Sequence, residues 1–429
     1  MKVKITLICL AFSLKTFSQN PAPALPQKDA ILIMNGTAHI GNGEVIKNSA
    51  IAIKDGKLLF VADATVIKFD KREFPIVIDA YGKHVYPGFI DCNSNLGLTE
   101  IDAIRSTRDF SEVGEYNPNV RAIIAYNTDS KIIPTIRSNG VLMVQIVPQG
   151  GVISGQSSVV ELDAWNWEDA AYKTDEGIHL DWPRMYTIPN NPKESEEVQK
   201  QKMQSNLDAI EFLFNEAKTY NLNKTSEEKN LKLEAMRGLF DGSKTLYVHC
   251  DYVKEIVSAI SMAKRFGMRM VLVGGDDAYR VTDLLKENNI SVILNSTHSL
   301  PPREDDDVDL PYKIPYLLKK AGILFAVSYD GSWQNRNLMF NAGTAAAYGL
   351  TKEEALAAIT SSPAKILGID NRAGTLENGK DATLFISDGD ALDMRTNNVI
   401  RAFIRGKDIN LDNVQKQLYR KYMKKYGLE

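Results

Sequence analysis

Short apolar runs that end in a glycine turn dominate the first part of the chain. Residues 31–34 lead into an Asn-Gly pair and residues 50–53 lead into an Asp-Gly pair. Such runs are typical of β-hairpins, because Asn, Asp and Gly accept the positive φ angles of a tight turn. The pattern therefore predicts a small sheet near the start of the chain.

Similar runs return near the other end of the chain, at residues 382–386 and 399–404. Two β-rich ends around a different middle indicate that both ends contribute strands to one unit. We therefore expect a small β-sandwich domain formed by both termini, built from residues 30–85 and 373–410. A C-terminal helix is predicted over residues 411–429.

The middle of the chain, residues 86–372, alternates apolar, β-branched runs with helix-like stretches. The predicted strands are residues 87–91, 140–147, 157–162, 177–180, 245–250, 268–273, 290–294 and 323–328. The predicted helices between or after them are residues 195–219, 253–265, 278–288, 311–321 and 355–360, the last opened by a capping box at 351–354. Eight strands alternating with helices predict an α/β fold, a (β/α)8 TIM-type barrel with parallel strands.

The first residues of the chain differ from the rest. Lys2 and Lys4 precede an apolar stretch, and Ser18 offers a small residue before a cleavage point at Gln19. We expect residues 1–18 to be a signal peptide, followed by a flexible leader over residues 19–29, and the protein to be periplasmic or extracellular. Beyond it, no apolar run reaches the ~20 residues of a transmembrane segment.

Composition restricts the classes of molecule that the protein is expected to bind. The chain has 429 residues with a net charge of −3, 44% hydrophobic and 24% charged residues. A protein that binds nucleic acid needs a concentrated excess of Lys and Arg, which this sequence lacks. We therefore expect a small-molecule substrate or ligand and no nucleic acid.

Four motifs resemble those of a known family. They are Tyr86-Pro87-Gly88-Phe89-Ile90-Asp91-Cys92-Asn93-Ser94-Asn95, Val248-His249-Cys250, Ser328-Tyr329-Asp330 and Leu376-Glu377-Asn378-Gly379-Lys380-Asp381-Ala382. With them the chain resembles the amidohydrolase superfamily, in particular its imidazolonepropionase-like branch, over nearly its whole mature length. The resemblance implies a metal-dependent barrel hydrolase acting on carbon–nitrogen bonds, other than classical peptide bonds, of a small cyclic amide or dipeptide-like substrate.

The resemblance also assigns residues to a site. His249 and Asp330 match two metal ligands of the family, and strand alternation predicts that residues 93 and 95 point with them into the barrel mouth, with Cys92 and Ser94 pointing away. A divalent metal such as zinc, held there with an open position, lowers the pKa of bound water to ~7.

The sequence departs from the family at the centre of this site. Where the family has a His-x-His pair, this chain has Asn93 and Asn95, so the metal site is predicted to be degenerate. If the protein is active, a single weakly held ion or a metal-free pair of Asp330, as general base, and His249 activates water. The alternative is a catalytically inactive pseudoenzyme, a ligand-binding or partner subunit that forms a homo-oligomer or associates with an intact relative.

Other residues have two readings each. A substrate-binding role is considered for Gly150 and Gln156, in a glycine-rich loop whose alternative is a tight β–β connection. It is also considered for His298 and Arg336, whose alternatives are a surface position or a packing contact. Residues 190–241 either cover the mouth or form an interface. Structural roles are predicted for His39, His84 and His179. Cys92 and Cys250 are predicted to be free thiols.

Overall fold

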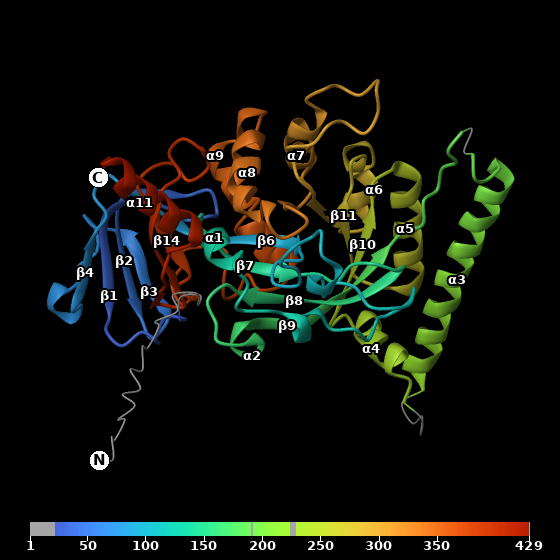
Figure 1. Ribbon diagram of the computed structural model, residues 1–429, viewed down its shortest axis with the longest axis horizontal. Coiled ribbons are helices and arrows are strands. Elements are labelled where there is room, and N and C mark those ends of the chain that lie inside the picture. Colours follow the sequence, from blue (N-terminus) through green and yellow to red (C-terminus); the bar gives the residue numbers. More distant parts are fainter. Residues whose placement is uncertain (1–21, 190–191, 224–228, 429) are drawn as a thin grey trace, which may run out of the picture.

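The computed structural model describes residues 22–189, 192–223 and 229–428, so the predicted signal peptide and the start of the leader lie outside it. Its strands form two eight-stranded sheets. Figure 1 shows one sheet at one end of the molecule, the second in the centre, and α3 as the outermost helix at the other end.

The first sheet, here the terminal sheet, takes strands from both ends of the chain. Its order is β16-β15-β14-β5-β1-β2-β3, with β4 paired to β1. Its strands are β1 (Ile31–His39), β2 (Val45–Lys54), β3 (Lys57–Asp63), β4 (Ile76–Asp79), β5 (His84–Pro87), β14 (Leu384–Ser387), β15 (Val399–Ile404) and β16 (Lys407–Asp408). β5 and β14 pair antiparallel, which joins the N-terminal and C-terminal contributions.

The second sheet is a nearly closed barrel with the order β13-β12-β11-β10-β9-β8-β7-β6. The strands are β6 (Phe89–Ser94), β7 (Val141–Ile146), β8 (Ile153–Glu161), β9 (Ala171–Asp181), β10 (Thr245–Cys250), β11 (Met270–Gly274), β12 (Ser291–Leu294) and β13 (Phe325–Val327). All eight predicted apolar runs therefore form strands. A parallel bridge between Ser94 and Gly331 joins the two ends of the sheet.

The prediction that every barrel strand is parallel is wrong for β8. This strand runs antiparallel to both β7 and β9. Residues 147–152 alone connect β7 to β8, and a connection this short joins antiparallel neighbours, because a parallel crossover needs a dozen or more residues. The glycine-rich loop around Gly150 is thus a β–β connection, and the barrel departs from strict (β/α)8 topology.

Most of the helices cover the outside of the barrel, and α11 lies beside the terminal sheet (Figure 1). The helices are α1 (Ile133–Arg137), α2 (Trp167–Ala170), α3 (Glu196–Leu222), α4 (Leu231–Phe240), α5 (Val253–Phe266), α6 (Thr282–Glu287), α7 (Leu310–Ala321), α8 (Leu338–Ala347), α9 (Lys352–Ala357), α10 (Ser361–Ile366) and α11 (Val414–Tyr426). The predicted capping box opens α9, where Thr351 Oγ1 accepts from the Glu354 N–H at 3.2 Å and Glu354 Oε2 accepts from the Thr351 N–H at 2.9 Å.

The large core lies between the barrel and the helices, and a separate cluster fills the barrel interior. The long helix α3 buries Ile210, Phe214 and Ala217, and its Glu211 pairs with Arg265 of α5 at 3.2 Å. Most of the polar segment 190–241 is therefore a helical layer stacked on α5. No helix of the described residues is both long and apolar enough to span a membrane.

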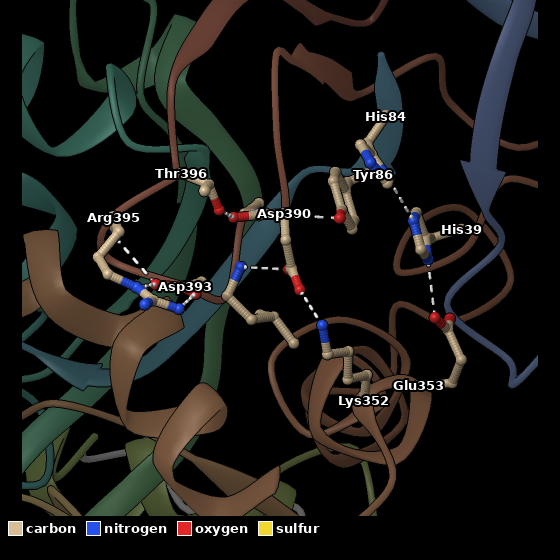
Figure 2. A network of polar contacts seen from close by, with 11 residues as sticks. His39, His84, Tyr86, Lys352, Glu353, Asp390, Asp393, Arg395 and Thr396 are labelled. Carbon is tan, nitrogen blue, oxygen red and sulfur yellow. Dashed lines mark hydrogen bonds and ion pairs between the residues drawn. The ribbon is translucent and has the colours of Figure 1, made fainter. Parts of the chain in front are cut away.

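A group of polar contacts connects the terminal sheet to α9 (Figure 2). His39 Nδ1 lies 2.7 Å from Glu353 Oε1, His39 Nε2 lies 3.0 Å from His84 Nδ1, and the His39 ring stacks on Tyr86 at 4.4 Å. Burial and the neighbouring His39 lower the pKa of His84. Both histidines therefore contribute to packing between the two parts of the chain.

Candidate active site

The site is built around His249, at the end of β10. Its Nε2 lies 2.8 Å from Nδ1 of His179, which is completely buried on β9 and stacks on Tyr247 at 4.7 Å. Burial lowers the pKa of both imidazoles, and His249 lowers that of His179 further. The two rings therefore form a neutral, hydrogen-bonded pair at pH 7.

Two carboxylates face this pair. Asp181 follows His179 on β9, and Asp330 lies just beyond β13; both oppose the effect of burial on the pKa of His249. Burial raises the pKa of Asp181, and His249 partly offsets that rise. The predicted neighbourhood of His249 and Asp330 is therefore present in the structure.

Asp330 lines a pocket of about 260 Å³ at the C-terminal ends of the barrel strands. Its lining residues are Asp251, Gly274, Asp276, Leu294, Asn295, Ser296, Thr297, Ser299, Leu300, Pro302, Pro311, Ile314 and Asp330. Burial and the nearby Asp276 raise the pKa of Asp251 to about 6. With three carboxylates and no Lys or Arg among these lining residues, the pocket disfavours anionic ligands.

Asn93, at the end of a distorted strand, contacts Asn295 of this pocket. Its Nδ2 donates to Oδ1 of Asn295 at 3.4 Å, and its backbone N–H donates to Gln145 Oε1 at 3.2 Å. Asn93 has a φ of 57°, and three steps along β6, from Asp91 to Ser94, oppose two steps along β7. This bulge reorients the end of β6.

The predicted orientation of Cys92 is wrong. Cys92 packs inside the barrel with Ile90 and Tyr247, whereas Cys250 packs outward among the helices as expected. Both cysteines are free and buried. Cys92 shares the inner side with Ile90, two residues earlier, so alternation holds as far as Cys92 and is broken at the left-handed Asn93, from which the orientation had been counted.

Asn95 lies after the bulge, within the predicted site. Its N–H donates to the Gly331 carbonyl at 3.1 Å, and its Oδ1, in a side chain only 5% exposed, has no hydrogen-bond partner. Asn95 therefore links the end of β6 to the segment that carries Asp330.

Asp91 has a structural role, unlike the residues at the predicted metal-ligand positions. One carboxylate oxygen accepts from the Tyr329 N–H at 3.1 Å and the other from Asn335 Nδ2. Complete burial raises the pKa of Asp91 to about 8. Asp91 thus ties β6 to the chain on either side of Asp330.

Below the histidine pair, a buried network is centred on Glu176. Its Oε1 accepts from Gln145 Nε2 at 2.6 Å and from Ser157 Oγ at 2.5 Å, and its Oε2 accepts from the Tyr247 hydroxyl at 2.7 Å. Gln145 also receives the Asn93 N–H, so the network supports both the bulge and the ring on which His179 stacks.

The four residues considered for substrate binding do not gather at the pocket. Gln156 Nε2 donates to the Pro118 carbonyl at 2.9 Å and its Oε1 accepts from Lys244, while Gly150 lies in the exposed β7–β8 loop. His298 is exposed and lies 2.6 Å from Thr344 of α8, and Arg336 stacks over Trp333 at 4.5 Å.

The donor set does not fit a catalytic zinc ion. Such sites use three protein ligands and an open position. Among the described residues no three His, Cys, Asp or Glu side chains are grouped so that they could hold a metal. His249 Nε2 is engaged by His179, and the two asparagines offer neutral amides, which bind zinc poorly.

Comparison with known proteins places this geometry in a family. The model of the Amidohydrolase family matches residues 203–409. Imidazolonepropionases from Rhizobium rhizogenes and Mesorhizobium japonicum are 23% and 22% identical, with 81% and 82% of this chain and 88% and 89% of theirs covered. These matches support assignment of the chain to the amidohydrolase superfamily.

Solved structures share the fold of this chain. An amidohydrolase from Thermotoga maritima is 24% identical with a TM-score of 0.75, covering 89% of this chain and 99% of that one. An Xaa-Pro dipeptidase with bound methionine is 14% identical with a TM-score of 0.54, covering 89% and 100%. At these identities the likeness supports the fold alone.

Sequence reasoning missed three residues of the candidate site. His179 was expected to be structural, although its alternation with Asp181 on one short strand was a usable signal. Asn295 and Glu176 carried no motif, and only the fold brings them to Asn93 and Tyr247.

Proposed function

We propose that the chain hydrolyses a carbon–nitrogen bond, other than a classical peptide bond, in a small cyclic amide or dipeptide-like substrate at the barrel mouth. The observation that carries this proposal is the neutral His249, bonded to His179 and facing Asp330 beside a 260 Å³ pocket. The family match and the imidazolonepropionase relatives support the reaction class.

The chemistry divides between an acid–base group and a hydrogen-bond donor. Asp330 accepts a proton from water as the water oxygen attacks the substrate carbonyl carbon, and the same proton then passes to the leaving nitrogen. His249, in the tautomer that accepts from His179 through Nε2, presents Nδ1–H to the carbonyl oxygen as negative charge develops there.

The substrate class follows from what the site can stabilise. A Lewis acid supplies several kcal/mol to a transition state of this kind, and a neutral imidazole supplies less. We therefore expect strained or activated cyclic amides to react and unstrained peptide bonds to resist. The carboxylates of the pocket favour neutral or cationic substrates.

The second candidate is a pseudoenzyme, which the two asparagines favour. Asn93 is bound to Asn295, and the described residues offer no three-donor group for a metal. In this reading the chain binds a ligand or partners an intact relative without turnover.

Hydrolysis of a panel of cyclic amides, with Asp330→Asn beside the exposed control Asp388→Asn, separates the two candidates. Turnover in wild type and control that disappears in Asp330→Asn supports the hydrolase. Thermal stabilisation by an amide without product in any variant would instead establish the pseudoenzyme.

A further inference from the structure

The C-terminal helix α11 has no buried residue along its 13 positions. It is held at its start, where Asn413 Oδ1 accepts from the Lys416 N–H at 2.8 Å and Asn413 Nδ2 donates to Ser138 Oγ at 2.9 Å. Isolated helices of this length are marginal in water, because most helical stability comes from packing one face. Figure 1 shows α11 at the edge of the molecule, beside the terminal sheet.

The helix nevertheless has two distinct halves. At about 100° per residue its apolar side chains fall in one half-circle and four of its five basic side chains in the other. The apolar half comprises Val414, Leu418, Tyr419, Tyr422, Met423 and Tyr426, and the basic half comprises Lys416, Arg420, Lys421 and Lys424. Lys425 lies within the apolar half, where its ammonium group sits over the rings of Tyr422 and Tyr426. The helix contains no Asp or Glu.

The apolar half is open to solvent. Leu418 is 45% exposed, Tyr422 50% and both Tyr419 and Tyr426 64%. Arg420 pairs with Asp412 at 2.7 Å, which leaves most of the positive charge uncompensated within α11.

We propose that α11 binds the surface of an anionic lipid bilayer. An interfacial helix combines an apolar face with a Lys/Arg-rich polar face, and tyrosine is enriched at the level of lipid headgroups. The charges of α11 complement anionic headgroups, while its tyrosines and Leu418 supply the surface that enters the interface.

A second copy of the chain fits this helix less well. The acidic loop 304–309 is the obvious complementary segment, but Asp306 is paired with Arg280 and Arg303, and Asp307 and Asp309 with Lys313. Three of the five acidic side chains of this loop are therefore already paired before any contact between copies.

The test is co-sedimentation of the full mature chain with vesicles of phosphatidylcholine alone or mixed equally with phosphatidylglycerol. Three variants are compared: K421Q/K424Q/K425Q, Leu418→Ser with Tyr422→Ser, and the control K47Q/K54Q/K68Q, which removes three exposed lysines of the terminal sheet and its loops. None of these residues is buried, so all variants should fold, which melting temperatures will check.

Wild type and control should bind the mixed vesicles and lose this binding at high salt. They should bind the neutral vesicles weakly or not at all. A basic residue near an anionic surface contributes a factor of about five, so the α11 triple variant should bind on the order of 100-fold more weakly. Absence of binding to mixed vesicles, or equal binding of the two triple variants, would overturn the proposal. Self-association lost in the α11 triple variant, without vesicle binding, would overturn it in favour of a contact between copies.

Discussion

Removing the Tyr247 hydroxyl tests the buried network beneath the site. The hydroxyl donates to Glu176 Oε2 at 2.7 Å, and both side chains are at most 2% exposed. In Tyr247→Phe the ring still stacks on His179, while one oxygen of the Glu176 carboxylate loses its donor without gaining water.

The expected cost follows from that unsatisfied group. A hydrogen bond to a charged group contributes about 1.5–3 kcal/mol, so Tyr247→Phe should lower the free energy of unfolding by about 2 kcal/mol. Equilibrium urea denaturation should show a lower midpoint with an unchanged slope. Tyr81→Phe, at a side chain 80% exposed, is the matched control and should change stability by less than about 0.5 kcal/mol.

A double-mutant cycle with Glu176→Gln isolates the pair. An amide nitrogen at residue 176 would face one of the donors from Gln145, Ser157 or Tyr247, so the single variant should also be destabilised. The two changes should be non-additive by about 1 kcal/mol or more. Equal stability of Tyr247→Phe and Tyr81→Phe would refute the reasoning, because Glu176 would then not depend on this donor.

Three further predictions concern other parts of the chain. Restoring histidines with Asn93→His and Asn95→His should recruit zinc together with His249 and Asp330, measured by metal analysis after dialysis; failure would show that the geometry of the mouth is wrong. The pKa of His84 is lowered from its ordinary 6.5, so the unfolded chain binds the proton more readily than the folded chain does. Stability is therefore lost as the pH falls below 6.5, and on acidification the melting temperature should drop less in His84→Gln than in wild type. We also propose export, and N-terminal sequencing of the secreted chain should begin at Gln19; an intact Met1 would contradict this.

The strands could be predicted because barrel strands are buried on both faces and read as continuous apolar runs. The direction of β8 could not be read from such a run, since a strand looks the same in either direction. The shortness of the segment 147–152 carried that information, and the β–β reading of the Gly150 loop was the correct one.

The site was predictable in part. The approach of His249 and Asp330 follows from strand ends that share one mouth. The left-handed Asn93 was not predictable, because the bulge depends on the pairing of β6 with β7 and on support from Gln145. His179 was assigned a structural role, although Asp181, two residues later on the same face of the strand, marked it as a candidate.

The most direct test of the central claim is the zinc content of the wild-type chain purified without chelators. With His249 bonded to His179 and asparagines at positions 93 and 95, we expect far less than one zinc ion per chain. One tightly held zinc per chain, lost in His249→Ala, would contradict the claim that this barrel mouth works without a catalytic metal.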